Sequence, residues 1–163
     1  MRQRRVAIAG FALSVLGFGI AAYLTALHYT TMVELVCPSG GLIDCEPVLT
    51  SPQSVVLGLP VAAYGLVWFA VNALLQALGL RKGGLSPWLR WVSLVWLAVG
   101  AVTVVYLVYV ELNVVGKVCI WCTGVHLIIL LLVALRVLSD HRESGGGWRF
   151  CGIRGPTFGR TGR

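Results

Sequence analysis

Two cysteines, Cys119 and Cys122, are separated by two residues in the stretch KVCIWCTGVH, which runs directly into a long apolar segment. If that segment is a helix, both thiols lie at its N-terminus, where free amide groups and the helix dipole stabilise a thiolate and lower its pKa. A disulfide closed over so short a loop removes little chain entropy and is a weak structural crosslink. The spacing therefore predicts a pair that takes part in thiol exchange.

A second pair, Cys37 and Cys45, lies earlier in the chain and encloses the sequence PSGGLID. The four cysteines have three interpretations. They could bind a structural zinc ion, although zinc sites usually offer two short-spaced pairs. They could form two inert disulfides, or they could form two dithiol pairs that exchange with each other in a relay. We favour the relay, because Gly40 and Gly41 would let the first pair approach the second.

The elements that must position these cysteines are long and apolar. The chain of 163 residues is 58% hydrophobic and only 12% charged, whereas soluble domains are about 25% charged. We therefore expect an integral membrane protein of the all-α class. A transmembrane helix needs about 20 apolar residues, and four runs are long enough to provide one: 6–27, 55–80, 91–110 and 118–135.

The basic residues indicate which way this four-helix bundle faces. Every Lys and Arg except Lys117 falls in the N-terminal tip, between the second and third runs, or after the fourth. The positive-inside rule makes that side cytoplasmic. Both termini are then cytoplasmic in a multi-pass protein of the cell (inner) membrane, and both cysteine pairs face the extracytoplasmic side. We expect a transmembrane domain over residues 1–138 and a basic, Gly-rich, disordered cytoplasmic tail over 139–163, which contains Cys151.

The pair formed by Cys119 and Cys122 lies where the hydrocarbon begins. It could therefore meet a water-soluble thiol on one side and a lipid-soluble molecule, such as a quinone, on the other. His126 follows Cys122 by four residues and shares its helix face. An ionisable residue inside a span is a candidate functional residue, and this imidazole could hydrogen-bond a quinone carbonyl or merely a neighbouring helix. Trp121, between the two cysteines, could pack over the quinone or anchor the helix end.

Four stretches of the chain combine in a specific order: LHYT, CPSGGLIDC, EPVLTSPQSVVLGLPVAAYG and CIWCTGVH. Loop cysteines precede the membrane pair, Ser51 follows the second loop cysteine by six residues, and Gly58 and Pro60 open the second span. Together these stretches resemble the vitamin K epoxide reductase family in its bacterial branch, over about residues 10 to 136. In the DsbB family, which is also a four-span bundle, the order of the two pairs is reversed.

The resemblance implies a quinone-dependent thiol oxidase in which electrons pass inward through two cysteine pairs. Cys37 would exchange with a separate thioredoxin-fold, DsbA-like partner, and Cys45 would pass the disulfide to Cys119. Cys122 would face a bound menaquinone or ubiquinone. The segment EPVLTSPQSVV would form a short interfacial helix that covers the quinone.

The chain also departs from the vertebrate members of the family. His126 stands where they have Tyr, and their Asn near the start of the second span is absent, which weakens the case for epoxide reduction. We expect the quinone to be bound by His126, Ser51, Trp121 and Cys122. We expect no metal site. The alternative function is a four-span binding or scaffold protein whose disulfides are only structural.

Overall fold

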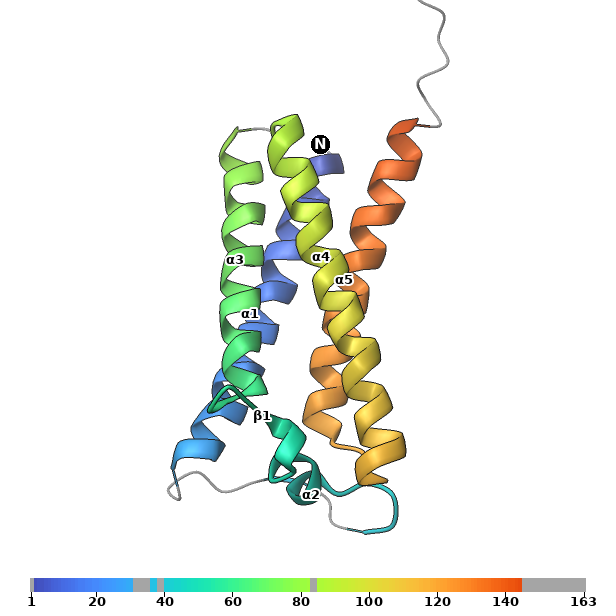
Figure 1. Ribbon diagram of the computed structural model, residues 1–163. Coiled ribbons are helices and arrows are strands. Elements are labelled where there is room, and N and C mark those ends of the chain that lie inside the picture. The colour runs from blue at the N-terminus through green and yellow to red at the C-terminus, as the bar shows by residue number, and fades with distance from the viewer. Residues whose placement is uncertain (1, 31–35, 38–39, 83–84, 145–163) are drawn as a thin grey trace, which may run out of the picture.

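The computed structural model describes residues 2–30, 36–37, 40–82 and 85–144. Four long helices run side by side along the molecule (Figure 1): α1 (Arg2–Tyr29), α3 (Val61–Lys82), α4 (Pro87–Tyr109) and α5 (Ile120–Ser144). The π-helical turn η2 (Val110–Val115) extends α4. The prediction of an all-α four-helix bundle is confirmed.

All four helices are long and apolar enough to cross a membrane, with mean hydropathies between 1.7 and 2.2. A helix satisfies its own backbone hydrogen bonds, which the hydrocarbon core of a bilayer requires. The chain is therefore a multi-pass membrane protein. The N-terminal end of α1, the end of α3 and the end of α5 lie at one end of the bundle (Figure 1). The tail after residue 144, with Cys151, lies outside the described residues, and α5 extends beyond the domain boundary expected after residue 138.

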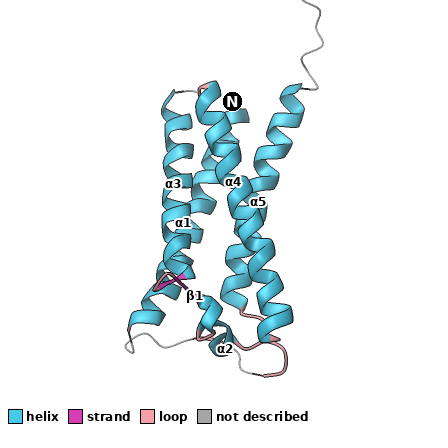
Figure 2. Cartoon of the chain, in the orientation of Figure 1, coloured by secondary structure: helices cyan, strands magenta, loops and turns pink. Residues whose placement is uncertain are grey.

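The connection between α1 and α3 gathers at the opposite end of the bundle, where Figure 2 shows the short strands and loops. It contains α2 (Cys45–Leu49), the 3-10 turn η1 (Pro52–Ser54), and an antiparallel hairpin of β1 (Val55–Val56) and β2 (Leu59–Pro60). The expected interfacial helix is thus present in two short pieces, because Pro52 lacks the N–H needed to continue α2 and opens η1 instead.

The second span begins after the N-terminal end of the apolar run 55–80, close to Gly58 and Pro60. Residues 55–60 form the hairpin, and the helix starts at Val61. Leu57 and Gly58 both have positive φ angles, 52° and 80°, which is the backbone of a tight hairpin turn. The hairpin residues are as apolar as the helix that follows, so hydropathy alone does not mark the start of the span.

Close contacts between the helices make the bundle rigid. The indole N–H groups of Trp68 on α3 and Trp96 on α4 each donate to the other residue's backbone carbonyl, both at 3.1 Å, and the rings stack. Between α1 and α3, the fully buried Asn72 amide donates to the Ser14 hydroxyl at 2.9 Å. Side-chain hydrogen bonds of this kind hold transmembrane helices together where hydrophobic association cannot.

Gly17 on α1 is needed for close approach to α3, because a Cβ at this position would overlap the buried ring of Phe69. We expect Gly17→Ala to lower the free energy of unfolding in detergent by about 1–3 kcal/mol, as overpacked cores do. Gly19→Ala is the matched control, since nothing lies within 4 Å of a Cβ there, and it should be neutral or slightly stabilising. Equal thermal unfolding of the two variants would contradict the close contact.

Candidate active site

A backbone bridge brings the two cysteine-bearing segments together. Ile43 pairs with Val118 in a parallel bridge, in which the Asp44 N–H donates to the Val118 carbonyl at 3.1 Å. The Val118 N–H in turn donates to the Leu42 carbonyl at 3.0 Å. Cys119 directly follows Val118, and Cys45 directly follows Asp44. Cys45 and Cys119, which are far apart in the sequence, thus become neighbours at the end of the bundle.

The first cysteine pair is oxidised. Cys37 and Cys45 form a disulfide with their Cα atoms 6.2 Å apart. Cys45 is the first residue of α2 and is only 1% exposed, whereas Cys37 is half-buried. An outside thiol therefore reaches this disulfide more readily at Cys37 than at Cys45.

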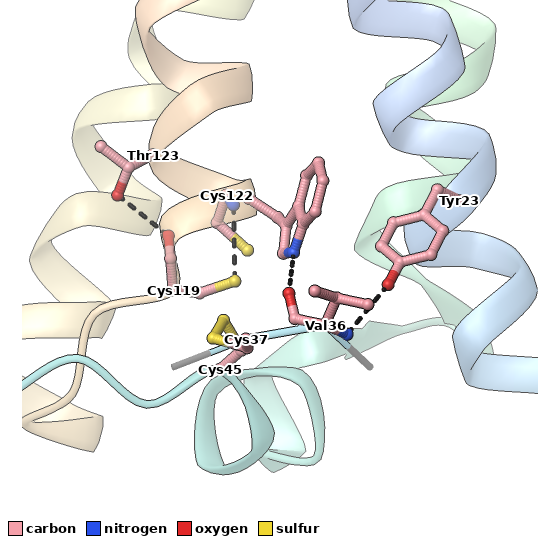
Figure 3. The surroundings of a disulfide bond; sticks show 8 residues. Tyr23, Val36, Cys37, Cys45, Cys119, Cys122 and Thr123 are labelled. Atoms are coloured by element: carbon pink, nitrogen blue, oxygen red, sulfur yellow. Dashed lines mark hydrogen bonds between the residues drawn. A yellow bond between two sulfur atoms is a disulfide. The ribbon is translucent and has the colours of Figure 1, made fainter. Parts of the chain in front are cut away.

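The second pair is reduced, and its two sulfurs differ in environment. Cys119 is completely buried and Cys122 is half-buried. The Cys122 side chain hydrogen-bonds the Cys119 sulfur and holds the pKa of Cys119 below its usual value, assisted by the backbone N–H groups of Cys122, 3.4 Å from that sulfur, and Trp121. In Figure 3 the Cys119 sulfur lies between Cys122 and the disulfide. The lowered pKa of the Cys119 thiol agrees with its place at a helix N-terminus.

Two side chains hold the segment that carries Cys37. The Trp121 indole N–H donates to the Val36 carbonyl at 2.8 Å, and the Val36 N–H donates to the Tyr23 hydroxyl at 3.2 Å (Figure 3). The rings of Tyr23 and Trp121 also contact each other, with centroids 5.0 Å apart. Helices α1 and α5 therefore clamp Val36 from both sides and fix the position of Cys37.

The residues predicted for quinone binding have different surroundings. His126 is 5% exposed on α5, and no hydrogen bond to its ring is found among the described residues. Trp121 uses its N–H for Val36, so only its ring faces are available. The Ser51 hydroxyl donates to the Val48 carbonyl at 2.9 Å, within the turn between α2 and η1. Among His126, Trp121 and Ser51, His126 is the residue whose ring nitrogens make no hydrogen bond among the described residues and could bind a ligand.

Sequence reasoning did not single out Glu111. Glu111 is 5% exposed in η2, at the end of the third span. The available signal was an acid set in an otherwise apolar run, YLVYVELNVV, which marks a candidate functional residue in a membrane span. Within the described ranges, no group of three or more His, Cys, Asp or Glu residues is arranged to hold a metal ion.

The fold and the site define a multi-pass membrane protein in which a disulfide lies beside a dithiol. A family model described as the vitamin K epoxide reductase family matches residues 8–137, which is most of the chain. The chain belongs to this family. It is accordingly a membrane oxidoreductase whose redox chemistry involves disulfides.

The clamp on Val36 predicts how fast the disulfide between Cys37 and Cys45 is reduced from outside. Trp121→Phe keeps a ring beside Tyr23 but removes the N–H, a bond worth about 0.5–1.5 kcal/mol. We expect reduction by dithiothreitol to become about two- to tenfold faster. The rate is measured by quenching with an alkylating reagent, in a Cys119→Ser background that prevents exchange with the second pair.

Trp88→Phe in the same background is the matched control, because Trp88 is 75% exposed at the other end of the bundle. Its reduction rate should equal that of the parent chain. Equal rates in the Trp121 and Trp88 variants would show that the indole N–H does not hold this segment.

Proposed function

We propose that the protein is a quinone-dependent thiol oxidase, which generates disulfides in a thioredoxin-fold, DsbA-like partner and passes the electrons to a membrane quinone. The observation that carries the proposal is the backbone bridge between Ile43 and Val118, which sets Cys45 beside Cys119. Cys45 and Cys119 are both almost completely buried. A purely structural disulfide would not need a pair of free cysteines beside it.

The relay begins at Cys37, the more accessible sulfur of the loop disulfide. A thiolate of the partner attacks Cys37 and releases Cys45, and the partner's second thiol then attacks the mixed disulfide, which leaves both loop cysteines reduced. With the second pair in its disulfide form, the Cys45 thiolate attacks Cys119, forms a bond to it and releases Cys122. Cys37 then attacks Cys45, which restores the loop disulfide and leaves Cys119 and Cys122 as a dithiol. Each exchange moves two electrons inward and needs three sulfurs in line, so the loop must move.

The residues around Cys122 fit a quinone. The half-buried sulfur and the buried His126 lie on one face of α5, one turn apart. His126 offers a ring N–H to a carbonyl oxygen that would otherwise lack a partner in this interior. The quinone, when bound, would accept two electrons and two protons from the dithiol. His126 would hold it, and Cys122 would face it.

The side on which the partner binds follows from charge. The basic residues described at the ends of α1, α3, α4 and α5 lie away from the cysteine end of the bundle. The positive-inside rule makes that basic end cytoplasmic. The disulfide and the dithiol would then face the extracytoplasmic compartment of the cell membrane, where disulfides persist. The partner would dock on the loop end, near Cys37.

Turnover of the purified protein with a reduced thioredoxin-fold partner and a quinone tests the function. Cys119→Ser and Cys122→Ser should each abolish quinone reduction, followed by quinone absorbance, because each removes an obligatory sulfur. Cys151→Ser is the control and should retain wild-type turnover. Quinone reduction by either the Cys119→Ser or the Cys122→Ser variant would contradict the relay, and so would a wild type that oxidises no partner. The alternative function, a binding or scaffold protein with structural disulfides, would then be favoured.

Trapping the exchange intermediate tests the contact between the two pairs separately. In a Cys37→Ser, Cys122→Ser double variant, Cys45 and Cys119 have no other partners in the site. Under oxidising conditions they should form a stable disulfide, which mass spectrometry of a proteolytic digest detects. Persistently free thiols at both positions would mean that the loop does not reach Cys119.

His126 should matter for quinone reduction but not for thiol exchange. A positioned hydrogen-bond donor at a developing oxyanion is worth about 10²- to 10³-fold in rate, so His126→Phe should lower turnover by about that factor. His126→Tyr keeps a donor and should retain far more activity. Trapping of the Cys45 to Cys119 disulfide should be unchanged in both variants. Equal turnover of all three chains would reduce His126 to a packing role.

A further inference from the structure

A cleft at the basic end of the bundle has no part in the thiol relay. It has a volume of about 380 Å³ and lies where the connection from α3 enters α4. The cysteine pairs are at the opposite end of the helices (Figure 1). The cleft is lined by Leu85, Pro87, Arg90, Trp91 and Leu94. Four apolar side chains and one cation therefore line the same space.

The sequence builds this cleft on one side of α4. Pro87 is the first residue of that helix. The lining positions on α4 recur at the helical spacing i, i+3, i+4 and i+7, so they share one face of its first turns. The remaining wall is Leu85, whose side chain packs over Gly79 on α3, 3.5 Å from the place that a Cβ would take there. The cleft thus occupies the corner between α3 and α4.

The charge around the cleft is positive. Residues 81–91 include Arg81, Lys82 and Arg90 and contain no acidic residue. Arg90 is half-buried, as is typical of a side chain whose aliphatic stem packs on apolar surface while its charged head stays at the polar edge. An occupant that suits this lining has an anionic end and an apolar end.

The cleft lies at the depth of the lipid headgroups. The candidate span 87–115 begins at Pro87, so Arg90 is in the first turn of the span. Trp88 and Trp91 are 75% and 68% exposed, and tryptophan side chains concentrate at the boundary between headgroups and hydrocarbon. Basic pockets beside transmembrane helices at this depth bind anionic lipid headgroups.

We propose that this cleft binds an anionic phospholipid. The Arg90 guanidinium binds the headgroup phosphate through charge-assisted hydrogen bonds, and Leu85 and Leu94 cover the first carbons of the acyl chains. The chains continue along the lipid-facing side of α4, where Val95 and Val99 follow Trp91 at intervals of four residues and are 59% and 50% exposed. The inference does not rest on the proposed relay.

Other occupants fit this lining less well. The sequence after residue 144 contains four arginines and no acidic residue, so Arg90 would repel it; the arginines are Arg149, Arg154, Arg160 and Arg163. A zwitterionic lipid brings a positive group into a region that is already basic. Free phosphate satisfies Arg90 but leaves the apolar wall of Leu85 and Leu94 in contact with water. An anionic phospholipid satisfies both the cation and the apolar wall.

Native mass spectrometry of the purified chain in detergent micelles tests the proposal. Delipidated protein is titrated with phosphatidylglycerol, which is anionic, and with phosphatidylcholine, which has no net charge. The first phosphatidylglycerol should bind about five- to tenfold more tightly than the first phosphatidylcholine. Arg90→Gln should lose this preference, whereas Arg90→Lys keeps the charge and should retain most of it. Equal affinity of the wild type for both lipids, or an undiminished preference in Arg90→Gln, overturns the proposal.

Matched variants separate this cleft from general attraction to a basic surface. Arg5→Gln removes the same charge from an exposed position on α1, at the same end of the bundle, and should keep the wild-type preference. Leu94→Phe fills the cleft without a change of charge and should weaken the binding of phosphatidylglycerol, which keeps the test decisive if Arg90→Gln does not fold. A loss in Arg5→Gln as large as in Arg90→Gln, or unchanged binding in Leu94→Phe, would show that the lipid does not bind in the cleft.

Inorganic phosphate distinguishes a lipid site from a site for free anions. Added in large excess, it should leave the bound phosphatidylglycerol in place, because burial of the acyl chains against α4 contributes to lipid binding and phosphate has no such part. Displacement of the lipid by phosphate would identify the cleft as a site for free anions and would refute the assignment to a phospholipid.

Discussion

The site depends on the backbone bridge between Ile43 and Val118. The loop between α1 and α3 is held to the end of the bundle by hydrogen bonds to Val118, Trp121 and Lys117, all near the start of α5. These bonds place the loop cysteines against the membrane pair. Packing of hydrophobic side chains alone would not fix that register.

The helical bundle provides a rigid reference for this loop. Gly17 and Gly100 allow the rings of Phe69 and Trp68 to pack directly against neighbouring helix backbones. The reciprocal bonds between Trp68 and Trp96 join α3 to α4. Such contacts allow few alternative packings of α1, α3 and α4. In the proposed relay, the loop would move relative to this bundle, because in-line attack requires one sulfur to approach another.

Much of the fold could be predicted from the sequence, because membrane spans have a strong compositional signal. The four helices, their order and the membrane class follow from apolar runs interrupted by charge. The hairpin at residues 55–60 could not be predicted by hydropathy, since Val55, Val56 and Leu57 are as apolar as the span. The bridge at Val118 is a long-range backbone contact and leaves no trace in local sequence. His126 attracted attention because it interrupts a run of aliphatic residues, whereas the burial of Glu111 could not be predicted from its place in the sequence.

The burial of the four sulfurs gives the proposed relay its direction. Cys45 and Cys119, the two sulfurs that would exchange between the pairs, are almost completely buried, while Cys37 and Cys122 are only half-buried. A soluble thiol can therefore reach the chain of sulfurs at Cys37 but not at its middle. Thiol exchange requires direct contact along the S–S axis, so buried middle sulfurs react with each other and not with small thiols in solution. In the proposed relay, electrons that enter at Cys37 would then leave through Cys122. The same burial makes an unpaired charge on Cys122 costly.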